Sequence, residues 1–323
     1  MARSEFELIS SYLTGLGARR DDVILGVGDD AALLAPPAGR KLAMTTDTLV
    51  SGVHFPEDAP PESIGHKALA VNLSDLAAMG AEPAWVTLAL SLPAADEAWL
   101  SAFCRGFSAL ARYHNVALVG GDLCRGPLSM SIHATGFVPH GRALRRSGAR
   151  PGDAIFVSGT LGDAALGLQL WRRHGVGALD AGCRQLIERL HRPTPRVSLG
   201  KALRECATAA IDVSDGLAAD LSHILRASHV GGLLDVERLP LSDAGKRLGG
   251  SDFPVLALRG GDDYELCFTV PRTRLHTIDA IASRVGVRLT RIGTVQPGDG
   301  LRLLNADHLP VAGAAAGYTH FAG

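Results

Sequence analysis

Apolar side chains recur along the chain with two different periods, one typical of α-helices and the other of β-strands. In residues 62–79 they recur every three or four positions, from Ile64 through Ala68 and Val71, which predicts a helix that ends at Gly80. Residues 96–114 predict a second helix, with Asp96 as a candidate N-cap. The remaining predicted helices cover residues 5–16, 162–173, 180–190, 217–228 and 274–285, with a further one that begins at about residue 196.

Short apolar runs bounded by turn residues predict the strands. They cover residues 23–27, 41–46, 85–92, 116–119 and 128–138 in the first half of the chain, and 154–157, 209–213, 232–236, 264–270 and 288–295 in the second. Between the halves, residues 139–153 are basic and rich in turn-forming residues, which predicts a domain boundary. The pattern therefore predicts an α/β chain of two domains, residues 1–140 and 141–323.

Composition narrows the class of protein. Hydrophobic residues make up 46% of the 323 positions and charged residues 20%, which allows a large core and excludes a disordered chain. The formal net charge is −1 and no basic run stands out, so nucleic acid is not an expected partner. No apolar stretch has the length of a membrane span or the place of a signal peptide, so no membrane partner is expected. The five cysteines lack metal-ligand spacing and indicate reduced thiols, which predicts a cytoplasmic protein.

Short acidic motifs stand out at the ends of the predicted elements. Each joins an apolar segment to a small or hydroxyl-bearing residue and one or more aspartates. Any one of them is explained equally well by a turn or a helix cap, in which Asp, Ser and Gly are common. The motifs are Gly28-Asp29-Asp30, Thr45-Thr46-Asp47-Thr48, Ser74-Asp75, Gly120-Gly121-Asp122, Asp212-Val213-Ser214-Asp215-Gly216 and Gly260-Gly261-Asp262-Asp263.

Together the motifs favour a metal site over six separate turns. Two like charges about 4 Å apart cost roughly 4 kcal/mol at an effective dielectric constant near 20, so converging carboxylates need cations. Mg²⁺ prefers oxygen ligands and is commonly shared between carboxylates and phosphates. The hydroxyls of Thr45, Thr46 and Ser214 can complete its coordination. The sequence leaves open whether these acids meet in space.

Other residues are candidates for binding a phosphorylated ligand. Gly121 and Asp122 follow the apolar run 116–119, where glycine lets the backbone approach a phosphate closely. Arg146 lies in the predicted boundary segment and carries a guanidinium that can clamp a phosphate. No P-loop motif is present. His54 and Tyr318 belong to no pattern of their own, and isolated residues of these types more often have structural roles.

Taken in order, the motifs resemble those of the thiamine-monophosphate kinase family. The resemblance extends over essentially the whole chain, to Gly317-Tyr318-Thr319-His320-Phe321 near its end. It implies an α/β fold with mixed sheets, of the aminoimidazole ribonucleotide synthetase-like (PurM-like) superfamily, with an N-terminal domain that binds ATP and dimerises through its sheet. The segments that carry it are GDDAA at 28–32, TTDTLVSGVHF at 45–55, NLSDLAAMGAEP at 72–83, VGGDLCRGPLSM at 119–130, RSGARPGDAIFVSGTLGDAALGL at 146–168, IDVSDGLAADL at 211–221 and GGDDYELCFTV at 260–270.

The resemblance also implies the reaction and its site. ATP and thiamine monophosphate would be the substrates, several Mg²⁺ ions the cofactors, and a homodimer the assembly. No catalytic nucleophile or general base is expected, because the acceptor is an ionised phosphate oxygen, so direct in-line transfer follows. The implied magnesium ligands are Asp30, Thr45, Thr46, Asp47, Asp75, Asp122, Asp212 and Asp215; the implied ATP contacts are Gly121, Asp122, Arg146 and Ser214; the implied thiamine monophosphate contacts are His54, Asp262, Asp263 and Tyr318.

Related families are the competing interpretations. A selenophosphate synthetase needs a reactive Cys or selenocysteine near the N-terminus, whereas the first cysteine is Cys104. A hydrogenase-maturation relative should end with a functional cysteine, whereas this sequence ends Phe321-Ala322-Gly323. An aminoimidazole ribonucleotide synthetase fits the segments 45–55 and 260–270 less well. A non-catalytic nucleotide sensor on the same fold is an alternative of another class, but such a protein has less need of so many metal ligands.

Overall fold

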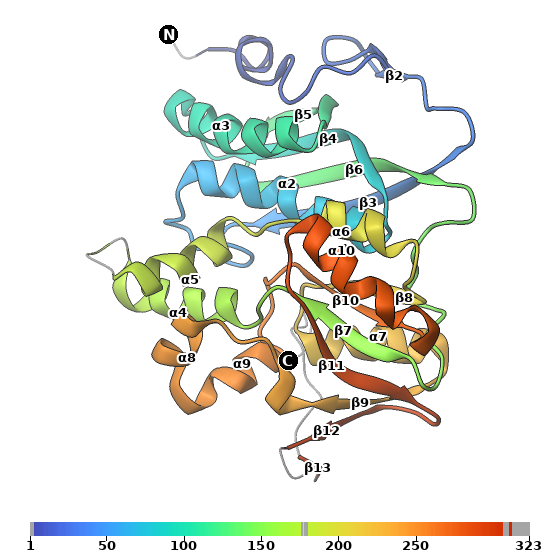
Figure 1. The fold of residues 1–323 in the computed structure, drawn as a ribbon. Coiled ribbons are helices and arrows are strands. Elements are labelled where there is room, and N and C mark those ends of the chain that lie inside the picture. The colour runs from blue at the N-terminus through green and yellow to red at the C-terminus, as the bar shows by residue number, and fades with distance from the viewer. Residues whose placement is uncertain (1–2, 176, 178–179, 306–309, 312–323) are drawn as a thin grey trace. The chain divides into compact units, whose positions relative to one another are not determined.

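The chain folds into two compact units (Figure 1). The first comprises Met1–Leu76 and Ala81–Arg142, and the second comprises Ala77–Gly80 and Ala143–Gly323. The computed structural model describes residues 3–175, 177, 180–305 and 310–311. The change from one unit to the other at Ala143 lies within the turn-rich segment 139–153.

A four-stranded mixed sheet, in the order β3-β6-β4-β5, forms the base of the first unit. β6 pairs antiparallel with both β3 and β4, and β5 pairs parallel with β4. The elements of this unit are α1 (Glu5–Leu8), the π-helix η1 (Ile9–Leu13), β1 (Val23–Leu25), β2 (Leu33–Leu34), β3 (Arg40–Val50), α2 (Pro61–Ala78), β4 (Glu82–Leu92), α3 (Glu97–Tyr113), β5 (Ala117–Arg125) and β6 (Ser129–Pro139).

Helices α2 and α3 lie on the same face of this sheet and touch at two glycines (Figure 1). A Cβ on Gly65 would lie 2.0 Å from the carbonyl oxygen of Phe103. A Cβ on Gly106 would lie 1.8 Å from the carbonyl oxygen of Glu62. Only glycine allows two helix backbones to approach so closely. The contact buries the rings of Phe103 and Phe107 completely.

The opposite face of the sheet carries the short hairpin formed by β1 and β2. Trp85 and Phe137 pack edge to face on this side, with ring centroids 5.0 Å apart. Val23 and Leu34 of the hairpin pack against this cluster. The indole Nε1 of Trp85 donates a hydrogen bond of 2.9 Å to Oδ1 of Asp22. The sheet therefore holds the hairpin, whose connecting turn contains the motif at residues 28–30.

The second unit is built on a seven-stranded sheet in the order β13-β12-β9-β11-β7-β10-β8. Its pairs are antiparallel except that β12 runs parallel to β9. The elements are β7 (Ala154–Ser158), α4 (Asp163–His174), α5 (Ala181–His191), α6 (Val197–Leu203), β8 (Ala209–Val213), α7 (Leu217–Ser228), β9 (Gly231–Asp235), η2 (Val236–Arg238), α8 (Asp243–Gly249), η3 (Gly250–Asp252), α9 (Phe253–Arg259), β10 (Glu265–Val270), η4 (Arg272–Thr277), α10 (Ile278–Val285), β11 (Leu289–Gln296), β12 (Leu301–Leu304) and β13 (Pro310–Val311).

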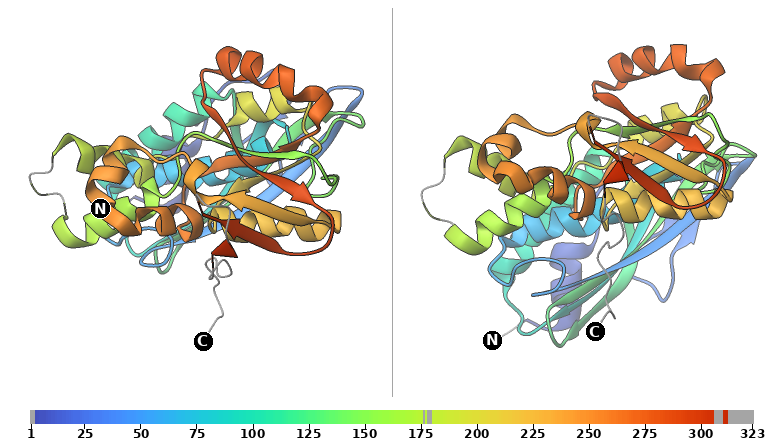
Figure 2. Two further views of the ribbon diagram at one scale, coloured as in Figure 1. Left: turned by 60° about the horizontal axis from the view of Figure 1, so that its bottom comes forward. Right: turned by 90° about the horizontal axis from the view of Figure 1, so that it is seen from below.

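Helices cover both faces of this sheet. α7 lies on one face, and α6 and α10 lie on the other (Figure 2). Leu217, Leu221 and Ile224 of α7 pack with Ile155 and Ile211 of the strands in one buried cluster. Helices α4, α5, α8 and α9 form a separate group beside the sheet, and Phe253 is fully buried in its core.

The predicted two-domain α/β fold with mixed sheets is confirmed. Several details differ, and the strands β2, β12 and β13 were not predicted. The helix predicted over residues 5–16 is shorter and divides into α1 and η1, and the helical turns between residues 243 and 259 were not predicted. The strand predicted to end at residue 119 continues to Arg125. Within the described residues, no helix is long and apolar enough to cross a membrane.

Candidate functional site

The alternation of strand β3 separates the hydroxyl and carboxylate residues of the first unit. Thr45 and Asp47 share one face, and the intervening Thr46 points to the other. The hydroxyl of Thr45 donates a hydrogen bond to the Asp75 carboxylate on α2. The backbone N–H of Asp47 donates to Oδ1 of Asn72 on the same helix, at 3.2 Å. The structure thus brings two of the predicted magnesium ligands, Thr45 and Asp75, into direct contact.

Thr46 takes part in a different set of contacts on the opposite face. Its hydroxyl lies 2.6 Å from Nδ1 of His133 on β6. Two residues further along, the hydroxyls of Thr48 and Ser131 are 2.7 Å apart. Thr46 and Thr48 are both exposed. This face therefore carries a polar ladder, separate from the contact between Thr45 and Asp75.

The motif Gly120-Gly121-Asp122 lies inside strand β5 and not after its end. Gly121 has a φ of +149°. A Cβ there would lie 1.9 Å from the carbonyl oxygen of Leu88 on β4. The prediction that these glycines end a strand was wrong, and Gly121 is required because β4 and β5 approach closely. Asp122 is exposed.

The register of the sheet sets Asp47 and Asp122 apart within one copy of the chain. Asp47 pairs with Ile132, Ile132 with Leu88, and Leu88 with Gly121. Asp47 and Gly121 thus end one row across four strands, a span of about 14 Å at roughly 4.8 Å per strand. Two ligands of one Mg²⁺ lie within about 4 Å of each other, because each Mg–O bond is about 2.1 Å. Within one copy, Asp47 and Asp122 therefore do not ligate the same ion.

Two further predicted residues of the first unit lie in turns. Asp30 is exposed, and its N–H donates to Oδ1 of Asp29 at 2.8 Å. His54 follows β3, and its Nδ1 accepts a hydrogen bond from the N–H of Val50 at 2.9 Å. An imidazole nitrogen that accepts is unprotonated, so the ring of His54 carries its proton on Nε2.

In the second unit, two of the acidic motifs meet at one edge of the sheet. β10 pairs antiparallel with β7 and β8, so the start of β10 lies beside the ends of the other two strands. The N–H of Asp262 donates to the carbonyl of Ser214 at 2.9 Å, and that of Tyr264 to the carbonyl of Val213 at 2.8 Å. A Cβ on Gly261 would lie 2.3 Å from the Ser214 carbonyl oxygen. The turns 214–216 and 260–264 are thereby bonded to each other.

Asp212 and Asp215 differ sharply in exposure. Asp212 is 5% exposed and pairs with Leu266 inside the sheet. Asp215 and Ser214 are partly exposed in the turn that follows. Oδ2 of Asp220 accepts the N–H groups of Ser214, Asp215 and Gly216 at 3.0, 3.1 and 3.1 Å. Burial raises the pKa of Asp220 to about 7, although these N–H groups oppose the shift.

Arg146 and Asp215 both act on the pKa of His223 on α7. The pKa of His223 on α7 is lowered by burial and by the nearby Arg146 and Arg226, while Asp215 acts in the opposite direction. The charges of Arg146 and Asp215 therefore both reach one imidazole. Arg146 itself is exposed, and its carbonyl accepts a hydrogen bond of 3.3 Å from the Ser228 hydroxyl.

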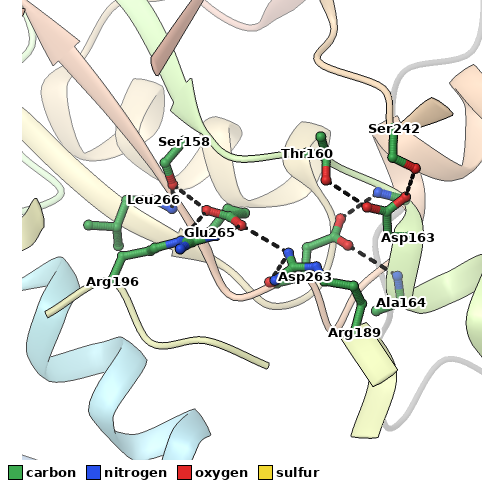
Figure 3. A network of polar contacts seen from close by, with 11 residues as sticks. Ser158, Thr160, Asp163, Ala164, Arg189, Arg196, Ser242, Asp263, Glu265 and Leu266 are labelled. Atoms are coloured by element: carbon green, nitrogen blue, oxygen red, sulfur yellow. Dashed lines mark hydrogen bonds and ion pairs between the residues drawn. The ribbon is translucent and has the colours of Figure 1, made fainter. Parts of the chain in front are cut away.

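Asp263 is buried and bonded to the start of α4 (Figure 3). Its carboxylate accepts the N–H groups of Gly162 at 2.7 Å and Ala164 at 3.4 Å. Burial raises its pKa to about 8, while nearby Arg189 acts in the opposite direction. Asp262 is partly exposed and adopts a φ of +69°. Of the two predicted acids, Asp262 is thus the one accessible to a ligand.

A buried ion network next to Asp263 was not predicted from the sequence (Figure 3). Glu265 is fully buried and accepts hydrogen bonds from Arg189 at 2.9 Å, from Arg196 and from the Ser158 hydroxyl at 2.5 Å. Arg189 also donates to the carbonyl of Asp263 at 3.2 Å. The one signal in the sequence was a glutamate inside an apolar strand, because such a charge needs buried partners.

Across the described residues, no group of three or more His, Cys, Asp or Glu side chains lies close enough to hold a metal ion. The predicted ligands are divided between the two units, with Asp30 to Asp122 in the first and Asp212 and Asp215 in the second. Their assignment stays a prediction. Tyr318 lies outside the described residues.

Comparison with known proteins places this geometry in a family context. Residues 28–138 match the AIR synthase related protein N-terminal domain, and residues 150–304 match the AIR synthase related protein C-terminal domain. Thiamine-monophosphate kinase of Salmonella typhimurium is 49% identical, over 100% of this chain and 99% of that protein. The crystal structure of thiamine-monophosphate kinase from Stenotrophomonas maltophilia K279a is 52% identical, covers 94% of this chain and 97% of that one, and has a TM-score of 0.86. The structure of AaThiL complexed with AMPPCP and TMP is 34% identical, covers 98% and 96%, and has a TM-score of 0.80.

Proposed function

The chain belongs to the thiamine-monophosphate kinase family, and on this basis we propose that it transfers the terminal phosphoryl group of ATP to thiamine monophosphate, giving ADP and thiamine diphosphate. The observation that carries the proposal is similarity over the full chain, including 34% identity to AaThiL, which was solved with AMPPCP and TMP. The acid motifs at residues 28–30, 45–48, 120–122, 212–216 and 260–263 supply the oxygen donors that such a reaction needs.

A coupled assay of ADP release tests this function. ADP should form when ATP, Mg²⁺ and thiamine monophosphate are all present. Thiamine, which lacks the phosphate, and pyridoxal phosphate, which is an unrelated phosphate, serve as control acceptors. ADP release that is equal with all three acceptors, or absent with thiamine monophosphate, would refute the proposal.

The donor set fits Mg²⁺, because it consists of carboxylates and hydroxyls, the hard oxygen ligands that this ion prefers. The contact between Thr45 and Asp75 shows that two such donors already lie together. When bound, Mg²⁺ would neutralise charge on the phosphate groups. We assign this role to Asp30, Thr45, Thr46, Asp47, Asp75, Asp122, Asp212 and Asp215.

The chain's own residues would bind and orient the two phosphates. Gly121, Asp122, Arg146 and Ser214 are the proposed ATP contacts, and the exposed guanidinium of Arg146 can offset repulsion between donor and acceptor. His54, Asp262, Asp263 and Tyr318 are the proposed contacts to thiamine monophosphate. The buried carboxylate of Asp263 limits its part to the backbone or to orienting the turn, which leaves the direct side-chain contact to Asp262.

The transfer itself is proposed to be direct. The acceptor oxygen is ionised at neutral pH, so positioning and charge neutralisation suffice without a general base. Incubation with ATP labelled at the γ-phosphate, without acceptor, should leave no label on the protein after denaturation. Covalent label in stoichiometric amount would contradict direct transfer.

We also propose a homodimer and a cytoplasmic location. The exposed face of the first unit's sheet carries Leu42 and Met44, which are 48% and 60% exposed, beside the polar ladder of Thr46 and Thr48. Exposed apolar side chains on a sheet face favour an interface. All five cysteines are free thiols, which suits a reducing compartment.

A further inference from the structure

We propose that Asp220 is a positioning residue for the nucleotide and magnesium contacts of the second unit, and that it acts by fixing the backbone of residues 214–216. Asp220 lies in the first turn of α7 and is 3% exposed. Its Oδ2 alone accepts three successive N–H groups, from Ser214, Asp215 and Gly216. The inference rests on the proposed function, which assigns Ser214 to ATP and Asp215 to Mg²⁺.

The contact decides which groups of the turn remain for a ligand. Successive N–H groups that point at one spot form an anion-binding nest. In this chain the nest is filled by the Asp220 carboxylate, so these amides are not available to a phosphate. The Ser214 carbonyl is also engaged, because it accepts the N–H of Asp262 at 2.9 Å. Ser214 and Asp215 therefore reach ligands through their side chains.

Backbone contacts hold the same turn from its other sides. Gly216 has a φ of +118°, and a Cβ there would lie 2.7 Å from the backbone of Arg259. A Cβ on Gly261 would lie 2.3 Å from the Ser214 carbonyl oxygen. The turn thus packs tightly between backbones, and Asp220 supplies the side-chain acceptor that sets its orientation. Without that acceptor, three buried or partly buried N–H groups lose their hydrogen-bond partner. Each unmade hydrogen bond lowers the stability of the turn.

Two substitutions separate the acceptor from the charge. Asp220→Asn keeps an oxygen that can accept the three N–H groups, whereas Asp220→Leu has the same branched skeleton and no acceptor. Ser222→Ala is the matched control on α7, because it removes only the bond of 2.6 Å from the Ser222 hydroxyl to the carbonyl of Ala218. If Asp220→Leu fails to fold, Asp220→Ala takes its place, since water can then reach the amides.

Hydrogen exchange measured by mass spectrometry gives a readout that does not depend on activity. In the peptide that spans residues 212–217, the amides of Ser214 to Gly216 should exchange at least about tenfold faster in Asp220→Leu than in the wild type, because their acceptor is gone. Exchange in Asp220→Asn and Ser222→Ala should stay within about threefold of the wild type.

Steady-state kinetics show whether the turn positions the nucleotide. The KM for ATP at fixed excess Mg²⁺ should rise at least about tenfold in Asp220→Leu, while the KM for thiamine monophosphate changes less than about threefold. Asp220→Asn should restore the KM for ATP to within about threefold of the wild type. A merely structural role would not produce this split, because a loss of folded enzyme lowers the amount of active protein without changing either KM.

Three results would overturn the inference. The first is hydrogen exchange at the wild-type rate in Asp220→Leu, and the second is an unchanged KM for ATP in that variant. The third is a change in the KM for ATP that equals the change in the KM for thiamine monophosphate, in both the Leu and the Asn variant. A wild-type chain that fails to phosphorylate thiamine monophosphate would refute the proposed function instead. In that case the exchange rates would still decide whether Asp220 holds the turn.

Discussion

At the scale of single residues, the carboxyl group of Asp263 makes stability depend on pH. Burial raises its pKa to about 8, whereas an aspartate in an unfolded chain has a pKa of about 3.9. Below a pH of about 4, both states hold the proton. Between about 4 and 8 the native state keeps the proton that the unfolded state loses. The contribution of this group to the free energy of unfolding therefore falls as the pH rises through that window.

Asp263→Asn removes this titration while keeping an oxygen that can accept the N–H of Gly162. The loss of stability between pH 5 and pH 8, measured from urea unfolding curves, should be smaller in the variant than in the wild type. Asp243→Asn, at an exposed position on α8, is the control for removing one carboxylate. Equal slopes in the wild type and Asp263→Asn would show that Asp263 is ionised in the native state.

The carboxylate of Asp122 is exposed, whereas that of Asp263 is buried. It is not part of the buried core, so Asp122→Asn should change the thermal unfolding midpoint little. If Asp122 holds Mg²⁺, the same substitution should lower kcat/KM at least about a hundredfold, because a neutral amide is a weak magnesium ligand. Asp299→Asn, in an exposed turn, should leave the rate unchanged. Turnover like that of the wild type in Asp122→Asn would remove this residue from the proposed ligands.

Local motifs can be predicted at this scale, but long-range partners cannot. The aspartates of the turns 212–216 and 260–263 stand out because of their neighbours in sequence, and the structure brings these two turns together. The partners of Glu265 are Arg189 and Arg196, which are 76 and 69 positions away. No local spacing indicates such a contact. Asp262 and Asp263 belong to the same motif, so the sequence does not distinguish them. Only the fold shows that the carboxylate of Asp263 accepts a hydrogen bond from Gly162.

At the scale of elements, the two adjacent glycines of β5 should differ in their tolerance of a side chain. Gly121→Ala places a Cβ 1.9 Å from the Leu88 carbonyl oxygen at a φ of +149°. It should lower the free energy of unfolding by about 3 kcal/mol, from backbone strain and overpacking. Gly120→Ala is the matched control, because its Cβ would meet only the Thr87 Cγ2, at 3.9 Å. Chemical denaturation measures both, and an equal loss in the two variants would contradict the β4–β5 geometry.

The long helices and strands could be predicted because their apolar residues recur with a regular period. Short elements, and strands interrupted by glycine, could not be predicted in this way. The helix predicted over residues 96–114 is α3 (Glu97–Tyr113), and the strand predicted over 128–138 is β6 (Ser129–Pro139). The pair Gly120-Gly121 suggested a strand end, although the backbone continues in the sheet. Helices α8 and α9 have seven residues each, too few for the apolar period to stand out. Their formation depends on packing around Phe253, which the sequence alone does not reveal.

At the scale of the whole molecule, the sheet of the first unit has one exposed face and two edge strands. β3 and β5 form the edges, and they carry Asp47 and Asp122. Within one copy these aspartates are too far apart to share an ion, as the register shows. The exposed face that carries Leu42 and Met44 is the one proposed to be covered by a second copy. The side chains of Thr45 and Asp47 lie on the other face, against α2.

Met44→Glu tests this assembly, because Met44 is 60% exposed on the face proposed to be covered. In a symmetric dimer the substitution enters the interface twice, so buried charge should raise the dimer dissociation constant at least about a hundredfold. Sedimentation equilibrium over a range of concentrations measures this change. Val255→Glu, at a 49% exposed position on α9 of the other unit, is the matched control and should leave the association unchanged. If the wild-type chain sediments as a monomer, or if both variants dissociate equally, the sheet face is not the interface. If only Met44→Glu loses the dimer and its Mg²⁺-dependent activity is also weaker, assembly is linked to the site.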